Sequence, residues 1–186
     1  MTPYEFRPNP TKSWQDQLVD LQGAVAQNDI VQTTLAPYLA EEFLPQIIRG
    51  AMNSEAVRKY ISGLNFREFN LTPQANIMSF SAQADISFEG AAKLLGSNRE
   101  VHLTGSMVIR NGIPSVEGLG ISITNLNFLQ RNAFDSQKKK IIEMVQNADI
   151  VSGAKSALEA TGISVENLNF GISELGLHIT LQKERK

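Results

Sequence analysis

The chain has 186 residues, with 17 basic and 19 acidic side chains and no cysteine. A chain of this length favours one domain whose hydrophobic core needs no metal or disulfide to hold it. The missing cysteines exclude disulfides, thiol catalysis and cysteine-ligated metal sites, and the near-neutral charge leads us to expect no nucleic-acid partner.

The apolar residues never form a run of about 18, the length that a membrane-spanning helix needs. The first residues also lack the basic-then-apolar layout of a signal peptide. We therefore expect no transmembrane segment and a cytoplasmic protein, or a secreted or periplasmic form that has already been processed.

Residues 1–12 contain three prolines, which exclude a helix and most strand pairing. We expect an extended arm outside a single domain of residues 13–186. The arm is either a frayed tail or a segment that lies on a neighbouring subunit, anchored there by Tyr4 and Phe6.

Residues 13–63 carry helical signals. Ser13 is a good N-cap, and the apolar residues that follow it have the three- and four-residue spacing of an amphipathic helix. Apolar residues come in pairs over residues 30–52, which predicts more helix, although Pro37 and Pro45 should divide or kink it. We expect these helices to cover one face of a sheet.

Residues 64–128 predict an antiparallel sheet. Apolar and polar residues alternate over residues 78–88, 101–109 and 119–123, which gives each strand one apolar and one polar face. The phase of the alternation changes near Arg67, and this indicates a bulge or a short break in the strand.

Two kinds of segment interrupt this sheet. Asn111-Gly112 separates two alternating runs and favours a two-residue hairpin, because both positions accept a positive φ. Gly118 and Gly120 then predict a bulge or a tight bend in the returning strand. Residues 91–95 are too apolar for an ordinary loop: they form either a helical turn tucked under the sheet or an exposed tip that touches a membrane or a partner.

Residues 135–161 have the apolar stripe of a second helix, with Asp135 or Ser136 as its cap and Gly162 as its stop. Residues 163–182 return to strand. The predicted fold class is therefore α+β: a twisted antiparallel sheet of four to six strands, packed on one face by the N-terminal helices and one long later helix.

The sequence offers little catalytic chemistry. His102 and His178 each stand between core-facing neighbours, so both are expected to point away from the core as solvated side chains. They lack the spacing of a transition-metal site. The glycines at 118–120 and the segment 153–156 each resemble part of a phosphate-binding loop but lack its other glycines. We expect no metal, no cofactor and no enzymatic activity.

The side chains that remain as site candidates are apolar. Methionine and phenylalanine concentrate on the covered face of the predicted sheet, and methionine suits a core or a permissive binding cavity equally. The candidate ligand-lining residues are Met78, Phe80, Ile86, Phe88, Leu103, Met107, Ile109, Leu119, Ile121 and Ile123. They either pack as ordinary core or surround an apolar ligand such as a lipid.

Lys138, Lys139 and Lys140, the lysine triplet, fall in the first turn of the predicted 135–161 helix, where positive charge opposes the helix dipole. The triplet forms either a solvated face or a contact with an anion or a lipid headgroup.

The order of these elements, together with residues 67–71, 84–90 and 101–123, resembles a single module of the tubular lipid-binding superfamily, whose members are similar to bactericidal/permeability-increasing protein. The resemblance spans about residues 55–183. It implies a strongly curved sheet wrapped around a long helix, with lipid tails held between them.

These observations favour a non-enzymatic carrier that binds an apolar ligand between sheet and helices. The alternative is a structural or assembly protein that docks on neighbouring subunits, or on another protein, through its arm and its sheet edges. An enzyme is the least favoured class.

Overall fold

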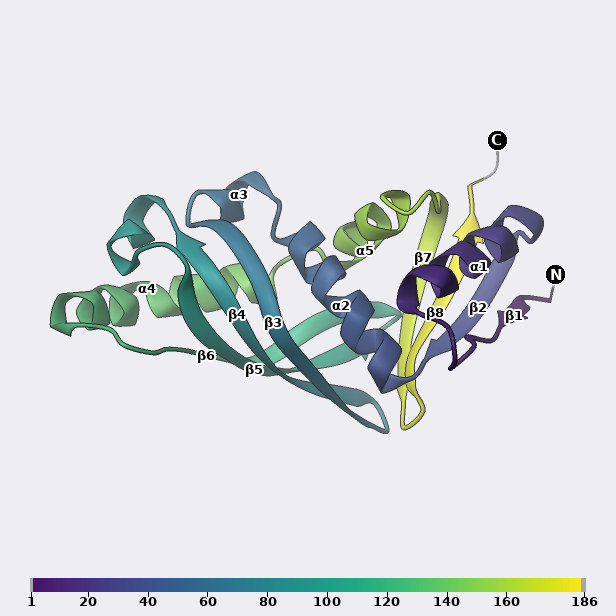
Figure 1. Cartoon of the computed structure of the whole chain (residues 1–186), viewed down its shortest axis with the longest axis horizontal. Coiled ribbons are helices and arrows are strands. Elements are labelled where there is room, and N and C mark those ends of the chain that lie inside the picture. Colours follow the sequence, from purple (N-terminus) through teal and green to yellow (C-terminus); the bar gives the residue numbers. More distant parts are fainter. Residues whose placement is uncertain (1, 185–186) are drawn as a thin grey trace.

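The strands form two four-stranded sheets that lie one after the other along the long axis of the molecule (Figure 1). The computed structural model describes residues 2–184. Sheet A has the strand order β1-β2-β8-β7, and sheet B has the order β3-β4-β5-β6. The predicted α+β class is confirmed, with the strands divided between two sheets.

The chain enters sheet A, builds the whole of sheet B, and then returns to sheet A. The strands are β1 (Tyr4–Phe6), β2 (Ile30–Leu35), β3 (Ile61–Gln74), β4 (Ile77–Phe88), β5 (Arg99–Arg110), β6 (Ile113–Ile123), β7 (Val165–Ser173) and β8 (Gly176–Lys183). The helices are α1 (Trp14–Gln27), α2 (Pro37–Ala51), α3 (Glu55–Arg58), the 3-10 turn η1 (Gly90–Leu95), α4 (Phe128–Gln146) and α5 (Ile150–Glu159). None of the helices within residues 2–184 combines the length and the apolar character that crossing a bilayer takes.

Sheet B contains the long strands whose alternating pattern stands out in the sequence. Asn111 and Gly112 form the tight turn between β5 and β6, with φ values of 54° and 77°. The strand register shifts at Arg67 and again beside Gly118, so both predicted bulges are confirmed. The hairpin tip reaches sheet A, where the Gly112 carbonyl accepts a 3.3 Å hydrogen bond from the Phe170 N–H of β7.

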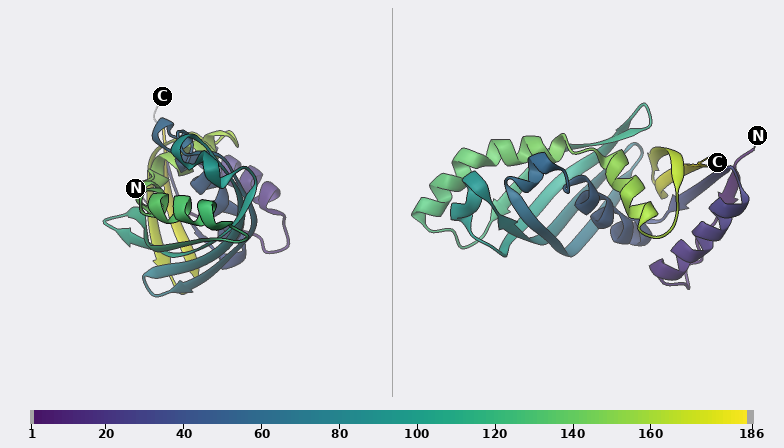
Figure 2. Two further views of the ribbon diagram at one scale, coloured as in Figure 1. Left: turned by 90° about the vertical axis from the view of Figure 1, so that its left-hand side faces the viewer. Right: turned by 90° about the horizontal axis from the view of Figure 1, so that it is seen from above.

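The strands of sheet B curl around the space that holds α4 and the end of α2 (Figure 2). α2 runs beside β3, and the Glu41 carboxylate accepts a 2.9 Å hydrogen bond from the Leu71 N–H. α4 runs beside β6, and its buried Phe134 and Ile141 belong to the core of sheet B. Each helix therefore covers one margin of the sheet, and the middle strands β4 and β5 lie between them.

The single helix predicted for residues 135–161 is in fact two helices, and its predicted cap is wrong. α4 begins earlier because Asn127 and Gln130 form a capping box around its first turn. Asp149 then caps α5 by accepting a 2.9 Å hydrogen bond from the Ser152 N–H. The lysine triplet consequently lies in the middle of α4, where the predicted conflict with the helix dipole does not arise.

Residues 30–35 were expected to be helical, but they form β2 inside sheet A. Their run Ile-Val-Gln-Thr-Thr-Leu is rich in β-branched side chains, and alternate residues face the core, as in a half-buried strand. Pro37 is the first residue of α2, where its missing N–H costs nothing. Pro45 lies inside α2, which continues to Ala51, so only the first proline marks a boundary.

The apolar segment at residues 91–95 belongs to η1, which packs beside the start of α4. Ala92 and Leu95 are buried, as expected for a turn tucked under the sheet. Leu94 is 59% exposed, and its carbonyl accepts a 3.4 Å hydrogen bond from Gln130 Nε2. The segment is thus anchored on one side and open on the other.

The N-terminal arm pairs with its own chain. β1 lies parallel to β2 at the edge of sheet A, and Phe6 packs against the core. The buried side chain of Gln17 in α1 hydrogen-bonds both the N–H and the carbonyl of Asn9. We expected a tail or an arm on a neighbouring subunit; the prolines instead leave residues 4–6 free to form a short strand.

α2 takes part in both hydrophobic cores. Leu44 and Ile47 pack with sheet A, α1 and α5, whereas Ile48 faces the core between sheet B and α4. α2 crosses α5 where Gly50 meets Gly153, and a Cβ atom on Gly50 would lie 2.7 Å from the Gly153 carbonyl oxygen. The two helix backbones are therefore in direct contact at this crossing.

Gly153→Ala is expected to lower the free energy of unfolding by about 1–3 kcal/mol, because the new methyl group must push α5 away from α2. The control is Gly23→Ala in α1, where nothing lies within 4 Å of the Cβ position. That change should stabilise the protein by about 0.5–1 kcal/mol, because alanine is the better helix former. Urea denaturation of the three proteins measures both effects. A Gly153→Ala protein more stable than wild type would show that the helices do not touch there.

Deleting residues 2–12 is expected to lower the free energy of unfolding by at least about 2 kcal/mol, because it strips the buried amide of Gln17 of both partners and uncovers apolar surface. Chemical denaturation at low protein concentration measures the loss. The same deletion combined with Gln17→Leu should recover part of it. An unchanged unfolding midpoint for the deletion would show that β1 adds nothing to the fold.

Candidate functional site

A small apolar cavity lies between sheet B and the helices. Its volume is about 30 Å³. The lining side chains are Ile48, Ala51, Met52, Phe66, Phe69, Phe80, Leu103, Val116, Leu119, Val145, Ala148 and Ile150. One or two waters would fit by volume, but these side chains offer them no hydrogen-bond partner.

Much of this lining is only half-buried, although it lies between a sheet and its covering helices. The half-buried members are Ile48, Phe66, Phe69, Phe80, Leu103, Val116, Val145 and Ala148. The reason is the placement of the helices: α2 follows β3 and α4 follows β6, so neither fully covers β4 and β5. Apolar side chains on the inner face of the sheet thus remain in contact with water.

Three aromatic rings form one wall of the cavity. Phe66 meets Phe69 edge-on with ring centres 5.3 Å apart, and Phe69 stacks on Phe80 at 5.7 Å. The Phe80 ring lies over Gly105 of β5, where a Cβ atom would come within 2.8 Å of it. A glycine at this position is what allows the ring to extend over the neighbouring strand.

The ten predicted lining residues separate into different environments. Phe80, Leu103 and Leu119 line the cavity. Met78, Met107 and Ile109 pack in the core shared with sheet A. The others pack in the core under α4: Ile86, Phe88, Ile121 and Ile123.

The remaining walls of the cavity lie outside the predicted set. They come from the end of α2, from β3, from Val116 of β6 and from the junction of α4 with α5. The sequence did contain a pattern from which Phe66 and Phe69 could have been predicted. The bulge at Arg67 changes the phase of β3, and this brings two aromatic residues three positions apart onto the same face.

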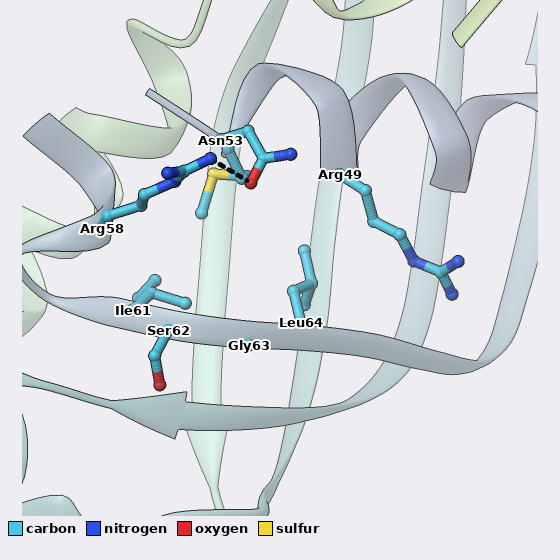
Figure 3. Close-up of a pocket in the computed structure, with 8 residues that line it drawn as sticks. Arg49, Asn53, Arg58, Ile61, Ser62, Gly63 and Leu64 are labelled. Atoms are coloured by element: carbon cyan, nitrogen blue, oxygen red, sulfur yellow. Dashed lines mark hydrogen bonds between the residues drawn. The ribbon is translucent and has the colours of Figure 1, made fainter. Parts of the chain in front are cut away.

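A groove of about 510 Å³ opens next to the cavity, between the end of α2 and the start of β3 (Figure 3). It is lined by Arg49, Met52, Asn53, Arg58, Ile61, Ser62, Gly63 and Leu64. Met52, Ile61 and Leu64 give it an apolar floor, and the exposed Arg49 and Arg58 stand on either side of it. Met52 also lines the cavity, so groove and cavity share a wall.

A second groove, of about 800 Å³, lies between α2–α3 and α4–α5 and includes Ala51, Ala148 and Lys140 in its lining. The lysine triplet does not converge there. Lys140 Nζ lies 4.7 Å from the centre of the Tyr60 ring, while Lys138 lies over Phe134 on its own helix. Lys139, the middle lysine of the triplet, pairs with Glu143 one turn further along α4.

The two histidines lie apart from the cavity. His102 Nε2 is 3.3 Å from a Glu100 carboxylate oxygen on the outer face of sheet B. His178 is half-buried rather than solvated, held between the hydroxyls of Thr34 at 2.7 Å and Ser173 at 2.6 Å. Because Nδ1 of His178 faces a threonine hydroxyl and not a carboxylate, this serine–histidine pair lacks the orienting acid of a catalytic triad.

Asp149, a charged residue in the lining of the second groove, stabilises the fold. The Ser152 backbone N–H and hydroxyl hold the pKa of Asp149 below its ordinary value. The carboxylate therefore caps α5 at neutral pH, and its contribution to stability is lost as the pH falls through the lowered pKa. Within residues 2–184, no three histidine, aspartate or glutamate side chains cluster as metal ligands.

No family model matches the chain, and no curated protein does. Among solved structures, lipopolysaccharide binding protein is similar over 84% of this chain and 49% of its own, with 13% sequence identity and a TM-score of 0.29. The chain thus spans about half the length of that structure.

Alanine substitution should distinguish the cavity wall from the closed core. Met107 is buried at 4% exposure, so Met107→Ala is expected to cost about 2–5 kcal/mol of unfolding free energy. Leu103 is half-buried beside existing empty space, so Leu103→Ala should cost less than about 1.5 kcal/mol. Guanidinium denaturation measures both values. Equal losses would mean that the cavity wall is packed as tightly as the core.

Proposed function

We propose that the protein is a non-enzymatic carrier that binds an apolar ligand, such as a lipid acyl chain, between sheet B and helices α2, α4 and α5. The observation that carries this proposal is the wholly apolar, half-buried lining between the layers. Leaving apolar surface in water costs about 25 cal/mol for each Å². A ligand that covers this lining removes the cost, and this gain drives binding.

Binding must be accompanied by separation of the layers, because a cavity of about 30 Å³ does not hold an acyl chain. Two grooves flank the cavity and share lining residues with it: Met52 on the α3 side, and Ala51 and Ala148 on the α5 side. A small displacement of the α2 end or of the α4–α5 junction would join groove and cavity into one channel. The ligand-bound protein is thus a conformation in which the helices and sheet B lie further apart than in this structure.

The proposal assigns no catalysis to this site, since every side chain in the lining is apolar. The alternative of an assembly protein depended largely on a free N-terminal arm. Because β1 pairs with β2 in its own chain, the arm is already engaged. The apolar lining therefore has the stronger support.

The neutral fluorescent probe N-phenyl-1-naphthylamine tests the proposal. Wild-type protein should bind it saturably with micromolar affinity, and Leu103→Trp should weaken binding at least about tenfold, because the indole fills the space above β5. Leu175→Trp is the matched control, since Leu175 is 73% exposed in the β7–β8 turn. Circular dichroism verifies that both variants are folded.

Absence of saturable binding by the wild type would contradict the proposal, as would unchanged binding by a folded Leu103→Trp protein. Native mass spectrometry of the purified protein provides an independent readout. Co-purifying acyl species should be present in the wild type and reduced in Leu103→Trp.

A further inference from the structure

The groove beside the cavity carries two arginines from different helices. Arg49 lies in the last turn of α2, and Arg58 is the last residue of α3. The turn between these helices, with Ser54 at the start of α3, brings the two side chains to either side of one groove (Figure 3). Both guanidinium groups are exposed and therefore accessible to a ligand.

The charges of these two arginines are not balanced by acidic neighbours. Arg58 donates to Asn53 Oδ1 at 3.4 Å, and Arg49 donates to Asn65 Oδ1 at 3.3 Å, so their partners are neutral amides at long distance. Within residues 2–184, neither forms a salt bridge. Each guanidinium has five N–H donors and engages one of them, which leaves donors available to an incoming anion.

Other arginines on the surface are in a different situation. Arg7 pairs with Glu5, Arg67 bridges Asp85 and Glu100, and Arg110 pairs with Glu117. The pKa values of Arg7 and Arg67 are accordingly raised by their carboxylate partners. The groove thus combines two arginines that lack such partners with a lining of apolar and neutral polar residues.

The groove floor lies next to the apolar cavity. Ile61 and Leu64 lie below the arginines, and Met52 forms part of both spaces. A molecule with an anionic head and an apolar tail fits this arrangement of arginines, apolar groove floor and apolar cavity. Its head would lie between Arg49 and Arg58, and its tail would pass over Met52.

We infer that the ligand is an anionic amphiphile whose carboxylate or phosphate is bound by Arg49 and Arg58. This inference rests on the proposed function, because it places the tail in the cavity. Guanidinium groups suit such a head, since they donate paired hydrogen bonds to carboxylate and phosphate oxygens. The arginines then determine which apolar molecules are selected, while the cavity supplies the driving force.

The test compares ligands that share one tail. Dodecanoate, dodecyl phosphate and neutral dodecanol are each tested for displacement of N-phenyl-1-naphthylamine from the wild type at pH 8, with the anions below their micellar concentrations and dodecanol below its solubility limit. We expect at least one of the two anions to bind about tenfold or more tightly than dodecanol. The anion that binds more tightly identifies a carboxylate or a phosphate as the preferred head.

The double variant Arg49→Gln/Arg58→Gln should lose that preference and keep the affinity for dodecanol. Arg49→Lys/Arg58→Lys should retain part of the preference, because it keeps the charge but not the paired donors. Arg7→Gln/Arg110→Gln is the matched control and should bind all three ligands as the wild type does. Because Arg49 also lies at the negative end of α2, the unfolding midpoint of each variant is measured alongside.

Two results would overturn the inference, and they differ from failure of the proposed function. The first is a wild type that binds dodecanol as tightly as both anions. The second is a glutamine double variant that retains the full preference for the anion. In both cases the cavity still binds a tail. If none of the three ligands displaces the probe from the wild type, the proposed function itself fails.

Discussion

The contact between α2 and α5 at Gly50 and Gly153 is the constraint on which the rest of the molecule depends. α2 belongs to both cores, and α5 continues from α4, so this one crossing fixes the helices of sheet A relative to those of sheet B. It also sets the width of the apolar space, because Ala51 and Ala148 line the cavity from the two sides of the crossing. With the backbones in contact, little room is left between the layers.

Local pattern was enough to predict sheet B. The alternation along β4, the Asn111-Gly112 turn and the bulge at Arg67 each depend on neighbouring residues, and each is present in the structure. β2 could not be found in this way. Its strand character depends on pairing with β8, which follows near the other end of the chain. Residues 30–52 contain the six residues of β2 followed by helix α2. Together their apolar residues look like the stripe of one long helix.

The candidate site was predictable only in part, for a related reason. Alternation identifies the inner face of the sheet, and Phe80 and Leu103 are found on it. Which inner residues meet open space depends on where α2 and α4 run, and no strand pattern contains that information. Arg49 and Arg58 carry no shared signal, since two separate helices and the turn between them place both at one groove.

The Gly112 hairpin tip has a consequence for how molecules of this chain meet one another. By bonding to Phe170, it engages the outer edge of sheet A at β7, while β1 occupies the opposite edge beside β2. α2 engages the edge of sheet B through the bond from the Leu71 N–H to Glu41. Unpaired strand edges are templates for pairing between molecules, and aggregation starts from them. Here one edge group of β7 and one of β3 are engaged by the chain itself, and β1, the last strand on the other side of sheet A, is only three residues long. Engaged groups and short edge strands both disfavour strand-to-strand association.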